Sequence, residues 1–302
     1  MFGTKLFAHL QLTRPANVVT AIADILAGFA IAGMGVYLTS FSNSENHLFD
    51  LAWLVLSTIG LYAGGVAFND VFDADLDAIE RPERPIPSGR ASIKSASIMA
   101  FSLLLIGVLA AAQVSMTSAL IAFGVAIFAV LYDYWGKHQN FFGPINMGLC
   151  RAGNLLLGVS VVPGLVSEFA FIGLIPLVFV AAITMISRGE VHGKNKRALF
   201  GGLGMYLIII AAIIVLAFVW GGKPFEVIPF IGLFAYMIFP PLIKAIKKQE
   251  PKLIGKAVKA AVISLIILNA SLSSAFAGWF YGLLVLILLP ISLWLARKFA
   301  VT

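Results

Sequence analysis

The chain has 302 residues, of which 60% are hydrophobic and only 12% are charged, and its mean hydropathy is +0.98. Soluble domains are closer to half apolar and a quarter charged, so this composition excludes an ordinary soluble protein and indicates a polytopic membrane protein. The formal net charge of +7 does not indicate nucleic-acid binding, because no soluble basic domain accompanies it.

The apolar segments predict the membrane-spanning helices, each of which needs about 20 mostly apolar residues. In chain order they cover residues 17–40, 51–72, 93–113, 117–134, 144–164, 170–187, 199–220 and 226–244. The apolar tail at 256–298 is long enough for one further span or for a hairpin of two. We therefore expect an all-α membrane bundle of nine or ten helices, formed by residues 1–302 as a single domain.

The positive charges predict the orientation of the bundle. Every Lys and Arg except Arg151 and Lys223 lies on one set of alternate segments. Cytoplasmic loops carry an excess of these residues, so one set of loops is expected in the cytoplasm: 73–94, 135–142, 188–198 and 245–256. The chain is expected to be a multi-pass protein surrounded by membrane lipids.

An acidic cluster ends the second predicted helix, in the segment GGVAFNDVFDADLDAIERPERPIPSGR. Its members lie three or four residues apart: Asn69, Asp70, Asp73 and Asp77. At 3.6 residues per turn these side chains share one helix face, with Asp75 on the opposite side. Stacked carboxylates repel one another, so the cluster predicts a bound cation, and oxygen ligands suit Mg²⁺ shared with a phosphate. The alternative is a solvated helix end whose acids pair with nearby arginines.

A basic loop braced by prolines follows the acids. Its cations are Arg81, Arg84, Arg90 and Lys94, and its prolines are Pro82, Pro85 and Pro87. Guanidinium groups suit phosphate geometry, and the prolines end the helix and stiffen the loop. The segment therefore predicts a site for a phosphorylated ligand.

The two patterns together resemble the first signature of the UbiA superfamily of intramembrane prenyltransferases. They are NDxxDxxxD, from Asn69 to Asp77, and RPxRPxxSG, from Arg81 to Gly89. Further similar segments are RPxN from Arg14, YDxxxK from Tyr132, and GPxNMGxxRxxNxxxG from Gly143. The resemblance covers essentially the whole chain and implies a bundle of about nine spans around a central cavity that is open to lipid.

The resemblance also implies a function and a site. Superfamily members move a prenyl group from a polyprenyl diphosphate to an acceptor, and Mg²⁺ neutralises the leaving diphosphate. The implied catalytic residues are Asp73, Asp77, Lys137 and Arg151. The implied substrate-binding residues are Arg14, Asn17, Arg81, Arg84, Asp133, Asn154, Arg188 and Lys194. The implied metal ligands are Asn69, Asp70, Asp73, Asp77 and Glu190, and the acceptor is not identified.

Two of these residues have structural alternatives. A charge within a span is costly and usually functional, so we expect Arg151 to face the diphosphate together with Asn154. It is alternatively a structural partner of Asp24, another charge within a predicted span. Lys137 lies four residues after Asp133, so these two side chains alternatively form a simple helical ion pair.

The sequence departs from the superfamily at the end of the sixth predicted helix. Typical members carry a second motif, DxxxD, at this place, whereas residues 184–197 read TMISRGEVHGKNKR, with Glu190 as their one acid. Cations such as Arg188 and Lys194 replace the acids there, or the segment is an ordinary cytoplasmic loop. This departure resembles a divergent bacterial branch called EboC, which implies a bacterial inner membrane and a site that faces the cytoplasm.

The altered segment leaves two functions open. The first is a Mg²⁺-dependent prenyltransferase. The second is a non-catalytic prenyl-diphosphate or lipid-binding protein, or a transporter component, that lost the second aspartate motif. A transporter is expected to carry broken helices and many polar groups at mid-membrane, and the sequence has few of these. We therefore expect the enzyme.

Overall fold

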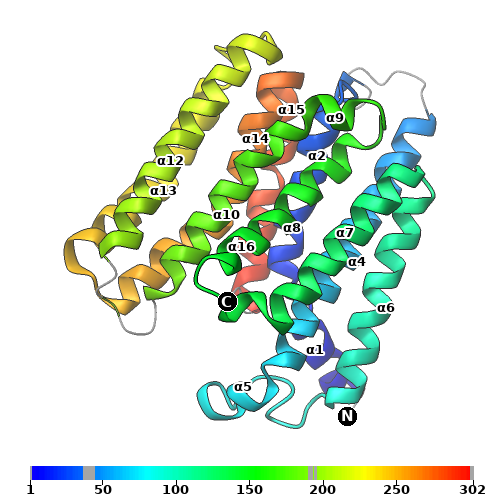
Figure 1. Cartoon of the computed structure of the whole chain (residues 1–302), viewed down its shortest axis with the longest axis vertical. Coiled ribbons are helices and arrows are strands. Elements are labelled where there is room, and N and C mark those ends of the chain that lie inside the picture. The colour runs from blue at the N-terminus through cyan, green and yellow to red at the C-terminus, as the bar shows by residue number, and fades with distance from the viewer. Residues whose placement is uncertain (1, 37–44, 190–192, 194–195, 300–302) are drawn as a thin grey trace.

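The protein is an all-α bundle in a computed structural model that describes residues 2–36, 45–189, 193 and 196–299 (Figure 1). The helices up to the middle of the chain are α1 (Phe2–Leu12), α2 (Pro15–Ile31), α4 (Glu45–Phe72), α5 (Ala74–Glu80), α6 (Ile93–Ala112), α7 (Met116–Tyr134) and α8 (Phe142–Val159). The later helices are α9 (Leu165–Phe169), α10 (Leu174–Ser187), α12 (Lys196–Leu216), α13 (Ile228–Lys248), α14 (Pro251–Ala277), α15 (Trp279–Leu286) and α16 (Leu288–Lys298). Within the described ranges there is no strand.

The long helices confirm the polytopic membrane fold. Eight helical segments of the described chain are long and apolar enough to cross a membrane, or nine if the bent pair α1 and α2 forms one span. Helix α8 does not meet this measure, and it carries Asn146, Arg151 and Asn154. It nevertheless packs inside the bundle against α2, α7 and α10. Its polar side chains therefore lie among helices rather than toward lipid.

Most helix bounds lie close to those predicted, and the largest differences are at the first two spans. Helix α2 ends at Ile31 rather than at residue 40, because Gly33 adopts a left-handed backbone with φ of 78° that ends the helix. The predicted residues 37–40 lie outside the described ranges. Helix α4 begins at Glu45 rather than at residue 51.

The C-terminal tail forms a hairpin of two spans rather than one long helix. Gly278 separates α14 from α15 with φ of 93°, a conformation that glycine adopts without strain. The returning segment α15–α16 is held against α2 by two side chains. Tyr281 donates a hydrogen bond to the Leu26 carbonyl at 2.9 Å, and Ser292 donates to the Ala16 carbonyl at 2.9 Å.

Helices α2 and α8 approach each other closely through two glycines. A Cβ atom on Gly28 would meet the Leu155 carbonyl oxygen and would lie 2.7 Å from the Gly158 Cα. A Cβ atom on Gly158 would lie 2.5 Å from the Ile25 carbonyl oxygen. Small residues allow membrane helices to pack backbone against backbone. This contact holds the polar residues of α8 beside those of α2.

We expect Gly28→Ala to lower the free energy of unfolding by about 1–3 kcal/mol, because the new methyl group must separate α2 from α8. Thermal unfolding of the purified protein in detergent measures the change. Gly124→Ala on α7 is the matched control, because no atom lies within 4 Å of its added Cβ. Equal stability of the two variants would contradict the close approach.

Candidate functional site

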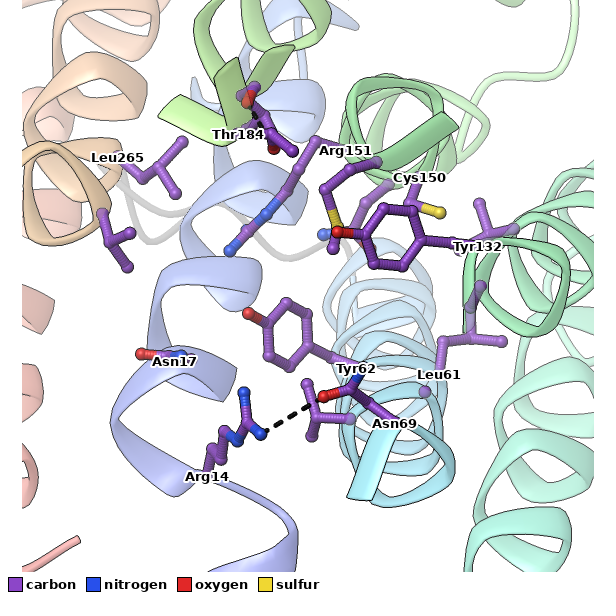
Figure 2. Close-up of a pocket in the computed structure, with 18 of the residues that line it drawn as sticks. Arg14, Asn17, Leu61, Tyr62, Asn69, Tyr132, Cys150, Arg151, Thr184 and Leu265 are labelled. Carbon is purple, nitrogen blue, oxygen red and sulfur yellow. Dashed lines mark hydrogen bonds between the residues drawn. The ribbon is translucent and has the colours of Figure 1, made fainter. Parts of the chain in front are cut away.

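Arg14, the first residue of the site along the chain, lies at a break between α1 and α2. Arg14 has a left-handed backbone with φ of 44°, and Pro15 follows as the first helical residue. A proline disfavours the helical conformation of the residue before it, so this dipeptide ends α1 and starts α2 at an angle of 43°. The Arg14 guanidinium points at α4, where it donates to Asp70 at 2.6 Å and to Asn69 at 3.4 Å, the latter bond being drawn in Figure 2.

The acidic face, which consists of Asn69, Asp70, Asp73 and Asp77, forms as predicted. Only Asp73 separates α4 from α5, and the backbone hydrogen bonds continue across it. The Asp73 amide donates to the Asn69 carbonyl at 2.9 Å, and the Asp77 amide donates to the Asp73 carbonyl at 2.7 Å. Asp70 and Asp77 are buried, whereas Asp75 is exposed. The face therefore points into the protein.

Cations from three different segments, one of them the neighbouring loop, neutralise the acidic face. Arg84 Nη1 contacts Asp77 at 2.7 Å and Asp70 at 3.3 Å, and Lys137 Nζ contacts Asp73 at 2.5 Å. The expectation that nearby arginines pair with these acids is thus confirmed for Asp70 and Asp77. The expectation that such a helix end is solvated is wrong, because Arg84, Lys137 and the acids themselves are largely shielded.

Lys137 does not pair with Asp133. Helix α7 ends at Tyr134, and the Trp135 backbone leaves the helical conformation, so Lys137 no longer lies on the α7 face. Asp133 instead accepts a hydrogen bond from Asn69 Nδ2 at 2.9 Å. The C-terminal ends of α4 and α7 are therefore linked twice, by the Lys137–Asp73 ion pair and by the Asn69–Asp133 hydrogen bond.

A cavity of about 310 Å³ lies beside the acidic face, among α2, α4, α7, α8, α10 and α14. Predicted site residues that line it are Arg14, Asn17, Asn69, Asp133, Arg151 and Asn154. Figure 2 shows the Tyr62 and Tyr132 rings projecting into it from α4 and α7. The three aspartates of the acidic face do not line the cavity. Arg14, the cationic partner of Asp70, lines the cavity instead.

Arg151 belongs to a buried polar network as well as to the cavity wall. Its Nη1 donates to Asp24 at 2.7 Å, and Asn154 and Asn269 donate to the same carboxylate at 2.9 and 2.6 Å. The expected alternative that Arg151 pairs with Asp24 is confirmed as a contact. The guanidinium also lies 4.9 Å from the Tyr62 ring centroid, at the edge of the cavity.

The sequence analysis missed two threonines of this network. Thr20 accepts a hydrogen bond from Arg151 at 2.5 Å, and Thr58 donates to Asn154 at 2.7 Å. Thr20 lies one helical turn before Asp24, so a polar spacing of four residues in an apolar helix was the available signal. The network therefore joins α2, α4, α8 and α14.

Four predicted residues stand apart from the cavity or cannot be placed. Arg81 is exposed in the loop after α5. Arg188 donates to the Asn140 carbonyl at 2.8 Å and thereby ties the end of α10 to the loop after α7. Glu190 and Lys194 lie outside the described residues.

The donor chemistry of the acidic face fits a hard divalent cation. Its side chains supply only carboxylate and amide oxygens, which are the ligands that Mg²⁺ prefers. In the described part of the chain, however, no three His, Cys, Asp or Glu side chains are grouped closely enough to hold a metal ion. The acids are instead engaged by Arg14, Arg84 and Lys137. A metal ion would have to share these oxygens with the cations.

The chain is similar to one protein family. A family model described as the UbiA prenyltransferase family matches residues 26–259. Among curated proteins, the digeranylgeranylglyceryl phosphate synthase of Ignicoccus hospitalis is 30% identical over 63% of this chain and 59% of its own length. That of Methanopyrus kandleri is 32% identical over 51% and 53%, and that of Sulfolobus acidocaldarius is 31% identical over 76% and 83%. The chain thus spans somewhat more than half of the first two relatives.

Solved structures share the fold. A structure of digeranylgeranylglyceryl phosphate synthase has a TM-score of 0.65 and 19% identity, and the match covers 90% of this chain and 99% of that one. A UbiA homologue from Archaeoglobus fulgidus bound to GPP and Mg²⁺ has a TM-score of 0.59 and 14% identity, over 88% and 99%. At such identities the likeness concerns the fold alone.

We expect Arg151→Met to destabilise the protein by about 3–5 kcal/mol, because it leaves the Asp24 carboxylate buried without its cation. The double variant Asp24→Asn/Arg151→Met is expected to lose less than the sum of the two single variants. Denaturant unfolding in detergent measures both effects.

Lys223→Met is the control for this pair, because Lys223 and Glu226 form an exposed contact at 3.6 Å that is worth less than about 1 kcal/mol. Additive losses at Asp24 and Arg151 would show that the two charges do not stabilise each other.

Proposed function

The chain belongs to the UbiA prenyltransferase family, and on this premise we propose that it transfers a prenyl group from a polyprenyl diphosphate to an acceptor inside the membrane. The observation that carries the proposal is the cavity described above, which lies beside a buried acidic face. Most of its lining residues are apolar and form an apolar body, and its cations Arg14 and Arg151 form a cationic rim. A prenyl chain suits the apolar body, and a diphosphate suits the rim.

The cations near the cavity support a diphosphate site. Arg14 lines the cavity, whereas Arg84 and Lys137 do not line it and are paired with Asp77 and Asp73 of the acidic face. Guanidinium and ammonium groups stabilise the charge that develops on a departing diphosphate, most strongly where water is excluded. As sequence-based proposals, we also assign substrate contacts to Asn17, which lines the cavity, and to Arg81 and Arg188, which lie outside its wall.

We propose that Asp73 and Asp77 bind Mg²⁺, with Asn69 and Asp70 as neighbouring ligands. Mg²⁺ held by these oxygens would act as a Lewis acid on the leaving diphosphate. The Archaeoglobus homologue was solved with GPP and Mg²⁺, which supports a divalent ion in the family. In this chain, the acids position Arg84 and Lys137 for the phosphate oxygens.

The transfer requires ionisation in a dry site. The C–O bond to the diphosphate breaks, its electron pair leaves with the diphosphate, and an acceptor oxygen forms a new bond to the prenyl carbon. The acceptor hydroxyl releases its proton, so the products are a prenyl ether, diphosphate and one proton. The aromatic faces of Tyr62 and Tyr132 at the cavity stabilise a neighbouring allylic cation and exclude water.

The acceptor proposal follows from the relatives. Three of them are digeranylgeranylglyceryl phosphate synthases, so we propose a hydroxyl group of a glyceryl phosphate lipid as the acceptor. The positive charges support a site that opens toward the cytoplasm, and the resemblance to the EboC branch supports a bacterial inner membrane.

One observation favours a second candidate, a non-catalytic binder of lipid diphosphates. Each aspartate of the acidic face already has a cationic partner in the protein itself. Such a face can bind a diphosphate through its arginines without promoting ionisation. Formation of a prenylated product distinguishes the two candidates.

We expect Asp73→Asn to lower the affinity for geranyl diphosphate in Mg²⁺ about 10- to 100-fold, because it removes one charge that holds both the metal and Lys137. Titration calorimetry with and without EDTA measures the affinity. Asp75→Asn, an exposed neighbour on the opposite face, is the control and is expected to bind like the wild type. Unchanged affinity after Asp73→Asn, or after EDTA, would remove the acidic face from the mechanism.

We expect the wild-type protein to prenylate a lipid when it is incubated with labelled diphosphates of several chain lengths and a membrane extract. Mass spectrometry identifies the product from the added prenyl mass. Tight binding of the diphosphate without any product would favour the non-catalytic binder instead.

A further inference from the structure

Asp133 differs from the three aspartates of the acidic face and from Asp24. Asp70, Asp73 and Asp77 each contact an arginine or a lysine. Asp24, deeper in the bundle, is likewise paired with a cation. Asp133 is just as well buried, with 4% exposure, but no described cation lies within 4 Å of it. Among the buried aspartates of the described chain, Asp133 is therefore the one without an ion pair.

The hydrogen bonding of Asp133 is also incomplete. Asn69 donates to Oδ1, and among the described residues no group donates to Oδ2. An ionised carboxylate accepts several hydrogen bonds, and a buried one is costly when they are missing. By comparison, three side chains donate to Asp24. Oδ2 of Asp133 can therefore accept a hydrogen bond from a ligand.

Asp133 is the one carboxylate that lines the described cavity. The cavity also carries Arg14 near the acidic face and Arg151 deeper in the bundle, both of which suit an anion. A diphosphate is repelled by a carboxylate, so it belongs near Arg14 rather than at Asp133. A neutral group with an O–H donor satisfies Asp133 instead.

We propose that Asp133 binds the hydroxyl group of the acceptor lipid and holds its oxygen toward the cavity. The inference rests on the proposed function and specifies it: the acceptor is an alcohol with a free O–H group, and α7 rather than the acidic face recognises it. The Asn69 amide orients the carboxylate by its hydrogen bond and leaves Oδ2 for the alcohol. The donor and the acceptor are then recognised by separate aspartates.

A binding experiment tests this assignment without requiring turnover. The probes are an ether-linked alkylglycerol phosphate with one free hydroxyl and its methyl ether, in which a methyl group replaces the hydroxyl hydrogen and removes the O–H donor. Both are titrated into the purified full-length protein in nanodiscs. Because the readout is the ratio of the two affinities within each variant, a general loss of affinity cancels.

We expect the wild type to bind the free alcohol about 10-fold or more tightly than the methyl ether, as a hydrogen bond to a charged group requires. Asp133→Leu is expected to reduce this preference to less than about twofold, and Asp133→Asn to an intermediate value. Thr184→Val is the control, because Thr184 lines the cavity but its hydroxyl already bonds the Val180 carbonyl at 2.9 Å. Its preference is expected to equal that of the wild type.

The opposite results overturn the assignment. One is equal binding of the two lipids by the wild type, including no detectable binding of either. The other is an undiminished preference in Asp133→Leu. A preserved preference for the alcohol in the wild type, combined with failure to bind geranyl diphosphate or to form product, would refute the proposed function and not the role of Asp133.

Discussion

The neutralisation of the acidic-face aspartates by cations from three separate segments is the interaction on which this site depends. A row of carboxylates one helical turn apart is unstable when shielded from water, unless opposite charges lie against it. Arg14 arrives from the α1–α2 break, Arg84 from the loop after α5, and Lys137 from the turn after α7. These contacts bring three connections between helices together beside one cavity.

The polar network around Asp24, deeper in the bundle, joins helices instead. The Asp24 carboxylate accepts hydrogen bonds from Arg151, Asn154 and Asn269, which links α2, α8 and α14 at a depth in the membrane where an unpaired charge is costly. The glycine contact between α2 and α8 brings their backbones close enough for these short bonds. The network thereby fixes the wall of the cavity, and its arginine still borders the space.

The acidic face and Asp133 adjoin each other through Asn69 but differ in how their charges are balanced, and this difference has a chemical consequence. The acidic face is already balanced by cations, so a phosphorylated ligand bound there, as proposed, would meet arginine and lysine donors with or without a metal ion. The Asp133 carboxylate is not balanced and prefers a neutral donor. A site that binds a diphosphate beside an alcohol, as proposed above, needs this difference between neighbouring side chains, because a carboxylate repels the diphosphate and accepts a hydrogen bond from the hydroxyl group.

The sequence by itself determined the membrane class, most of the spans and the composition of the acidic face. Apolar length and the spacing of three and four residues are local properties, and they survive folding: Asn69, Asp73 and Asp77 form one hydrogen-bonded column as their spacing predicts. Only the tertiary structure decided the partners. Lys137 reaches Asp73, from which it is separated by 64 residues, rather than Asp133 four residues away, because α7 ends between the nearer two. Likewise, the tail folds into a hairpin because Gly278 adopts a left-handed backbone, which hydropathy does not reveal. Charge pairing across helices depends on where each helix stops and which way it turns, and these depend on the packing of the whole bundle.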